Sequence, residues 1–384
     1  MRSGGLWILG FIGGGMVAAA IGLAHPVKLT SLAPPQIEPV AEDPFEPLQA
    51  ASRDACQEPH PARFHDQAPD CAVTRRHLEG GEIIYRWNAC RVRSDLPCTP
   101  RPPRTLRLLA VGDSMTMGAL AAVGDTYPAA LERHLARQAG RSFEVHNRGV
   151  AGYGLYQSSL LALDAADHDA QLVILGLAAN DLAEDLSPER LRAWDRAAAR
   201  FAEAAPDAGT ASRVGFRLTV LDEAKRLAVA SPLALSLKKL LFRSDRLYVE
   251  LYRRRGAAWL EEPDGERWRA RLADAERLLA GLAARLEAQG RRLVVLVIPQ
   301  RVQALLVSTA PRPDLDPHAF GRDIEAIGAR HGIPVIDALD MLAGLPRPGD
   351  LYHPLDGHFV PEGYRRLGHH VGAELLRRDL LGPD

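Results

Sequence analysis

Four short motifs in this sequence carry the residue types of an acyl-transfer site. Gly-Asp-Ser occupies residues 112–114, Gly-Val-Ala-Gly occupies residues 149–152, Asn180 precedes an aspartate, and Asp-Gly-His occupies residues 356–358. A serine, a histidine, an acid and amide donors are the parts from which serine esterases are built. The motifs therefore predict nucleophilic catalysis through a serine ester.

The nucleophile of this site would be Ser114, because it follows an apolar run at residues 106–111. A serine at the turn from a strand to a helix projects its hydroxyl over the edge of the sheet, and its own N–H can face an oxyanion. The simpler interpretation is that Asp-Ser caps a helix.

Two further residues are candidate oxyanion donors. Gly152 ends a glycine-rich stretch whose backbone can approach a ligand closely, although such a stretch also forms ordinary tight turns. Asn180 follows a third apolar run, and its side-chain amide could donate to the oxyanion. Such a donor contributes about 3 kcal/mol to the transition state. The alternative role of Asn180 is to cap a loop.

Two acid–histidine pairs near the C-terminus compete for the role of base. Asp356 and His358 stand immediately before the start of the last expected helix, which Pro-Glu-Gly marks at residues 361–363. Asp350 and His353 form the second pair, a few residues upstream. The residues alone leave both pairs open as the base and its orienting acid.

Alternating strand and helix patterns predict the elements that position these motifs. Near-continuous apolar strands that alternate with helices indicate a parallel sheet covered on both faces. Ligands of such sheets gather at the carboxyl ends of the strands. The expected strands cover residues 106–111, 143–146, 172–175, 293–298 and 333–336, and the expected helices cover residues 127–138, 157–165, 267–289, 320–331 and 362–376.

Residues 184–262 interrupt this alternation and are rich in Ala, Arg and Leu. They predict a helical insert, which is either a solvated addition or a cap over the substrate. Leucines at residues 233–241 are interrupted by Lys238 and Lys239. That mixture favours a cap packed on its own domain over a lipid-facing surface, so we expect short acyl chains.

The N-terminus predicts export. Residues 3–24 are uncharged and apolar, and about 20 such residues span a bilayer. We favour an uncleaved membrane anchor over a cleaved signal peptide with a site at residues 22–24. Arg2 marks the cytoplasmic side, which places the body in the periplasm, or outside the cell if the segment is cleaved. A Pro-rich linker is expected at residues 25–55.

All four cysteines fall within the expected lead-in, residues 56–103, ahead of the catalytic domain at residues 104–384. An even cysteine count beyond an export segment predicts disulfides, and four cysteines allow three connectivities. Zinc is the weaker interpretation, because no Cys-x-x-Cys occurs. Apart from one strand at residues 82–87, the lead-in is expected to consist of loops.

Composition excludes some classes of protein. The chain has 384 residues, 47% of them hydrophobic, which suits a globular body with a large core. Its formal net charge of -1 gives no indication of a nucleic-acid partner.

The order of the four motifs resembles the SGNH hydrolase superfamily, also called GDSL esterases and lipases. The resemblance covers about residues 104–381 without the insert, and it implies an α/β fold, a flavodoxin-like three-layer α/β/α sandwich with a parallel sheet. It implies Ser114 as nucleophile, Gly152 and Asn180 as oxyanion donors, His358 as base and Asp356 as acid. Many members carry Asp-x-x-His, whereas this pair is Asp-x-His.

A looser resemblance concerns the lead-in. Tyr-Arg-Trp-Asn at residues 85–88 is similar to the lead-in of membrane-anchored members associated with bacterial surface polysaccharides. The expected function is therefore an exported serine esterase that removes short acyl groups, most simply acetyl, from a carbohydrate, with no metal or organic cofactor. The alternatives are an O-acetyltransferase that modifies an envelope polysaccharide and a non-catalytic binding protein of polysaccharide assembly.

Overall fold

The computed structural model describes residues 56–60, 62–182, 194, 242, 244–253, 258–261, 265–308, 312 and 314–382. The expected anchor, the expected linker and most of the expected insert lie outside these residues. Across the described ranges, no helix combines the length and the apolar character needed to cross a membrane.

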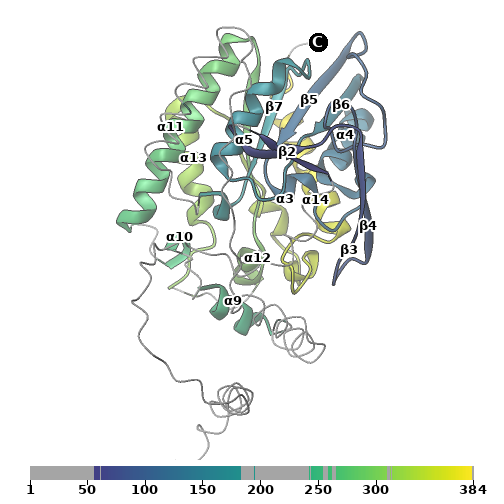
Figure 1. Ribbon diagram of the computed structural model, residues 1–384. Helices are drawn as coiled ribbons and strands as arrows, with labels where there is room; N and C mark the ends of the chain where they lie inside the picture. The colour runs from purple at the N-terminus through teal and green to yellow at the C-terminus, as the bar shows by residue number, and fades with distance from the viewer. Residues whose placement is uncertain are drawn as a thin grey trace, which may run out of the picture. The chain divides into compact units, whose positions relative to one another are not determined.

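A five-stranded parallel sheet forms the centre of the domain (Figure 1). Its strands are β5 (Thr105–Val111), β6 (Ser142–Asn147), β7 (Leu172–Leu177), β8 (Arg292–Val297) and β9 (Val335–Asp337). Their spatial order is β6-β5-β7-β8-β9, with every neighbouring pair parallel. Numbered along the chain, this is the flavodoxin-like order 2-1-3-4-5. The predicted α/β fold is confirmed.

Helices cover both faces of this sheet (Figure 1). One face carries α4 (Tyr127–Gln138) and α14 (Pro361–Arg377), and the other carries α5 (Leu155–Ala162), α11 (Glu266–Ala288) and α13 (Ala319–His331). The remaining helices are α3 (Ser114–Met117), α9 (Asp245–Arg253), α10 (Ala258–Glu261) and α12 (Arg301–Ser308). Short 3-10 turns are η1 (Val123–Asp125), η2 (Leu163–Ala166), η3 (Ala179–Leu182), η4 (Ala338–Leu342) and η5 (Pro348–Leu351).

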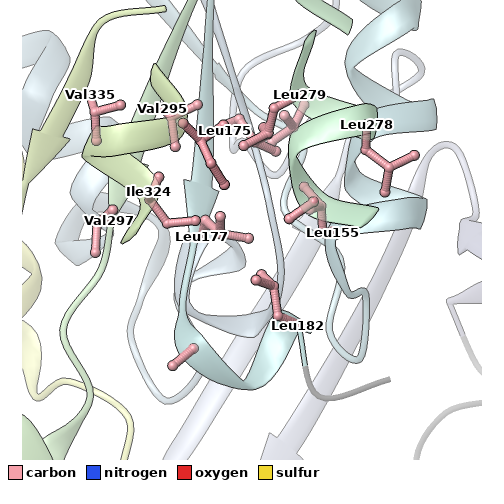
Figure 2. Packing of buried hydrophobic residues seen from close by; sticks show 14 of the residues in the cluster. Leu155, Leu175, Leu177, Leu182, Leu278, Leu279, Val295, Val297, Ile324 and Val335 are labelled. Atoms are coloured by element: carbon pink, nitrogen blue, oxygen red, sulfur yellow. The ribbon is translucent and has the colours of Figure 1, made fainter. Parts of the chain in front are cut away.

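Alternation along each strand divides the core into two layers. On β5, Leu108 and Ala110 face the α4 and α14 layer, whereas Leu109 and Val111 face the α5 and α11 layer. Figure 2 shows the second layer, where leucines of α5 and α11 and an isoleucine of α13 gather around apolar residues of β7, β8 and β9. Burial of one such side chain contributes about 2 kcal/mol, so the sheet is held rigidly beneath the loops at its edge.

The lead-in differs from its prediction. It forms two antiparallel hairpins, in which β1 (Gln57–His60) pairs with β2 (Phe64–Gln67) and β3 (Cys71–Arg76) pairs with β4 (Glu82–Trp87). Only the β4 strand was expected. The other three strands are short and partly polar, and their pairing depends on tertiary contacts that local patterns do not reveal. Helix α12 was also not expected.

Two disulfides are present in the lead-in. Cys56–Cys71 links the residue before β1 to the start of β3, and Cys90–Cys98 closes a loop after β4. Cys56 is fully buried in a small core with Tyr85, Trp87 and Met117. Because Met117 belongs to the catalytic domain, this core packs the disulfide-linked part of the lead-in against that domain. Because all four cysteines are bonded to one another, none is left to ligate zinc.

Protein taken from its native compartment should therefore contain no free thiol. Alkylation under non-reducing conditions, followed by peptide mass spectrometry, should recover the two disulfide-linked peptide pairs. Alkylation after reduction is the control and should label all four cysteines. Four alkylated cysteines without reduction would contradict oxidation, and crossed pairs would contradict the connectivity.

Candidate active site

Ser114 begins α3 directly after β5, at the carboxyl edge of the sheet. The preceding residue, Asp113, caps the helix by accepting the Met115 N–H at 2.8 Å. Gly149 of the second motif packs against this turn so closely that a Cβ there would lie 2.0 Å from the Met117 nitrogen. Both interpretations of Gly-Asp-Ser are therefore realised, because the aspartate caps the helix while the serine faces the site.

Ser114, His358 and Asp356 form one chain of hydrogen bonds. The Ser114 hydroxyl donates to His358 Nε2 at 2.7 Å, and His358 Nδ1–H donates to the Asp356 carboxylate. The His358 side chain is 17% exposed and that of Asp356 is 35% exposed. This is the connectivity of a nucleophile, a general base and the acid that orients the base.

The loop that carries the acid and the base is closed by its own backbone. The His353 N–H donates to the His358 carbonyl at 2.8 Å, and the Gly357 N–H donates to the His353 carbonyl at 2.9 Å. Pro361 then starts α14, a position that proline favours because its fixed φ suits the first turn of a helix. The imidazole is therefore presented to Ser114 from a short, tightly turned segment.

The electrostatics of the pair suit a base that accepts a proton from serine. Burial alone would lower the pKa of His358. The charge and hydrogen bond of Asp356 raise that pKa by more than burial lowers it, so the pKa of His358 lies above its usual value. Burial raises the pKa of Asp356, but the charge and hydrogen bonds of His358 lower it to about 2. Asp356 thus remains a carboxylate at neutral pH and stabilises the protonated form of His358.

The other sequence pair is not brought together. The Asp350 carboxylate pairs with Arg347 at 3.0 Å and is largely exposed. His353 is buried, and no described residue offers a hydrogen bond to its Nε2. The geometry therefore favours Asp356 and His358 over Asp350 and His353.

The two expected oxyanion donors lie on loops at the same edge of the sheet. Gly152 follows β6, is exposed and has φ of +81°, a left-handed conformation that favours glycine. Asn180 lies in η3 after β7, and its Oδ1 accepts from the Gln300 Nε2. The amide nitrogen Nδ2 is the donor of this side chain, and the contact of Oδ1 with Gln300 fixes the orientation of the amide.

Sequence reasoning missed two residues that touch this site. Gln300, just beyond the end of β8, holds the Asn180 amide and accepts in turn from Tyr252 of α9. Its place after the clearest predicted strand was a usable signal. Glu79, in the turn between β3 and β4, accepts the N–H groups of Leu355 and Asp356. Nothing in the sequence around Glu79 indicates that contact.

Within the ranges that the structure describes, no group of three or more His, Cys, Asp and Glu side chains is placed to hold a metal ion. The residues at the site instead supply a hydroxyl, an imidazole, carboxylates and amides. These groups support covalent acyl transfer.

Comparison with solved structures finds similar chains at low identity. The crystal structure of TesA is 18% identical over 70% of this chain and 97% of its own length, with a TM-score of 0.39. A lipase/acylhydrolase from Enterococcus faecalis is 14% identical, covering 71% of this chain and 96% of its own, with a TM-score of 0.38. Axe2, an acetylxylan esterase from Geobacillus stearothermophilus, is 13% identical over 73% of this chain and 95% of its own length, with a TM-score of 0.40.

Comparison by sequence identifies the family. No curated protein matches the chain. The sequence model of the GDSL-like lipase/acylhydrolase family matches residues 110–366, which is more than half of the chain. The matched range begins within β5 and extends into α14, so it includes the nucleophile turn, both oxyanion loops and the acid–base loop. The chain therefore belongs to the GDSL-like lipase/acylhydrolase family and is an ester hydrolase of the SGNH type.

Proposed function

We propose that the protein is an exported serine esterase that removes acetyl groups from a carbohydrate, with Ser114 as nucleophile, His358 as base and Asp356 as orienting acid. The observation that carries the mechanism is the continuous hydrogen-bond chain from the Ser114 hydroxyl through His358 to Asp356. Gly152 and Asn180 complete the proposed site as oxyanion donors, together with the Ser114 N–H.

The reaction would proceed in two halves. His358 Nε2 takes the Ser114 proton as Oγ attacks the ester carbonyl, and the oxyanion of the tetrahedral intermediate accepts from the three amide donors. His358 then protonates the sugar oxygen, which leaves, and Ser114 holds the acetyl group. Water, deprotonated by His358, attacks this ester, and collapse of the second intermediate releases acetate and restores Ser114.

The surroundings of the site support a polar, short-chain substrate. Glu79, Asp356, Gln300 and Asn180 are polar and at least partly exposed near the reacting serine. In the described part of the chain, exposed large apolar side chains are few and lie mainly in the lead-in: Phe64, Leu78, Ile84, Leu96 and Val307. A lipid substrate needs a broader apolar face than this set supplies.

The insert would contribute the wall that selects the alcohol. In its described helix α9, the Tyr252 hydroxyl donates to the Gln300 side chain, and Gln300 donates in turn to Asn180. Tyr248 of the same helix lies over the guanidinium of Arg301, 4.1 Å from the ring centre, and Arg301 donates to the Pro354 carbonyl of the acid–base loop at 2.8 Å. These contacts favour a cap packed beside the site over a solvated addition.

Export is proposed on two grounds. Residues 3–24 have the length and apolar character of a membrane anchor or signal segment. The two disulfides require an oxidising compartment to persist. The proposed location is the periplasmic side of the inner membrane, with the carbohydrate an envelope polysaccharide or its precursor.

Activity against para-nitrophenyl esters of increasing chain length tests the substrate proposal. We expect kcat/KM to be highest for acetate and to fall steadily as the acyl chain lengthens, because the proposed acyl pocket is built from the short core loops. Acetylated sugars should release acetate, measured with and without an unmodified sugar acceptor. Activity that rises beyond octanoate would favour a lipase, and acetylated acceptor as the main product would favour an O-acetyltransferase.

A further inference from the structure

The turn between β3 and β4 contacts the acid–base loop directly. Glu79 Oε2 accepts the N–H groups of Leu355 and Asp356, each at 2.9 Å, across a sequence separation of more than 270 residues. The turn lies in the lead-in, ahead of residues 110–366 that match the family. A segment outside the matched region thus binds the backbone of the proposed catalytic acid.

The same hairpin is also fixed to the segment that follows the nucleophile. Tyr85 of β4 is fully buried, and its hydroxyl accepts the Leu120 N–H at 3.0 Å while contacting His77 Nε2 at 2.9 Å. The buried Arg93 guanidinium, stacked on the Tyr85 ring, donates to the carbonyls of Met117, Gly118 and Ala121. The hairpin therefore bridges the segment after α3 and the loop that carries Asp356 and His358.

Two consecutive N–H groups converging on one carboxylate oxygen restrict the peptide planes on both sides of residue 355. The orientation of those planes sets the direction of the Asp356 side chain, which is only two residues from His358. Without the Glu79 carboxylate, both N–H groups would bind water instead, and the two peptide planes would be free to rotate. Small displacements of this kind cost a catalytic site far more than they cost the fold.

We propose that Glu79 is a positioning residue for the ester hydrolysis, holding the Asp356 loop so that the carboxylate orients His358 toward Ser114. The proposal rests on the function proposed above. On this proposal, the β3–β4 hairpin of the lead-in belongs to the catalytic unit and is more than a connection toward the N-terminus.

Glu79→Ala and Glu79→Met, which retains the side-chain length but not the carboxylate, test the proposal in the full-length protein. We expect both to lower kcat on the order of 10²-fold with little change in KM. Glu79→Gln retains an acceptor oxygen and should keep most of the activity. The matched control is Glu82→Ala, an exposed glutamate of the same hairpin, which should behave as the wild type.

The pH profile separates positioning from loss of stability. The titratable groups that interact with His358 are Asp356, Asp113, His77 and His353. Glu79 holds the backbone of Asp356 and is a charged neighbour of His353. If Asp356 moves away, His358 loses the interaction that raises its pKa, so the acid limb of kcat/KM should move to lower pH. Lowered Tm alone would not move that limb.

Three outcomes would overturn the proposal: Glu79→Ala and Glu79→Met with kcat within twofold of the wild type, a loss of activity with an unmoved acid limb, or an equal loss in Glu79→Gln. Should Glu79→Ala fail to fold, Glu79→Met carries the same decision. Wild-type protein that neither hydrolyses esters nor reacts with a fluorophosphonate at Ser114 would contradict the proposed function itself. Active wild type with unaffected Glu79 variants would contradict only this inference.

Discussion

Ser114→Ala should lower the rate of ester hydrolysis by about 10⁶-fold and abolish covalent labelling by a fluorophosphonate. The reason is that Ser114 Oγ is the atom hydrogen-bonded to His358 Nε2, and removal of a nucleophile leaves only the contribution of substrate binding and the oxyanion donors. The measurement is the steady-state rate with para-nitrophenyl acetate, together with mass spectrometry of the labelled peptide.

The fold should survive this substitution, because Ser114 lies at the surface end of α3 and Asp113 still caps that helix. Far-ultraviolet circular dichroism and Tm should match those of the wild type. Ser142→Ala, which changes an exposed serine at the start of β6, is the matched control and should leave rate and labelling intact. Undiminished turnover by purified Ser114→Ala would contradict the mechanism and leave the family fold without the proposed chemistry.

The sequence predicted the parts of the fold that local patterns specify. The central strands β7 and β8 are near-continuous apolar runs, and such runs are visible because both faces of a parallel sheet are buried. The edge strand β6 instead alternates apolar and polar residues. The motifs that follow β5, β6 and β7 could then be placed at one edge of the sheet. The choice between the two acid–histidine pairs rested on the family resemblance, because local patterns left both pairs open.

Contacts between distant segments could not be predicted in this way. The partly polar strand β3 acquires its structure by pairing with β4, and Glu79 acquires its partners from a loop far along the chain. The Gln300 contact with Asn180 likewise depends on how β7 and β8 lie side by side. Local patterns in the sequence predict which residues lie at the edge of the sheet. The hydrogen bonds that orient those residues join distant segments and form only when the domain packs.

His358→Ala should lower kcat by several orders of magnitude, whereas His353→Ala should have a much smaller effect, mainly on KM. His358 is the imidazole within 2.7 Å of the Ser114 hydroxyl, and Asp356 holds its other ring nitrogen. His353 contacts neither group through its Nε2, and its natural acid partner in sequence, Asp350, pairs with Arg347 instead. The two variants form a matched comparison, because each removes one imidazole from the same loop.

The pH dependence distinguishes the base from a residue that only shapes the loop. Hydrolysis requires neutral His358, so kcat/KM should rise with pH through the pKa of His358, which Asp356 holds above its usual value. Asp356→Asn removes the stabilising charge, so the acid limb should shift to lower pH while the plateau rate falls about 10⁴-fold. His353→Ala should leave Asp356 and its hydrogen bond to His358 in place, and therefore should leave the acid limb within a few tenths of a pH unit of the wild type. A greater loss of kcat in His353→Ala than in His358→Ala would instead assign the base to His353, with Asp350 as the acid to test next.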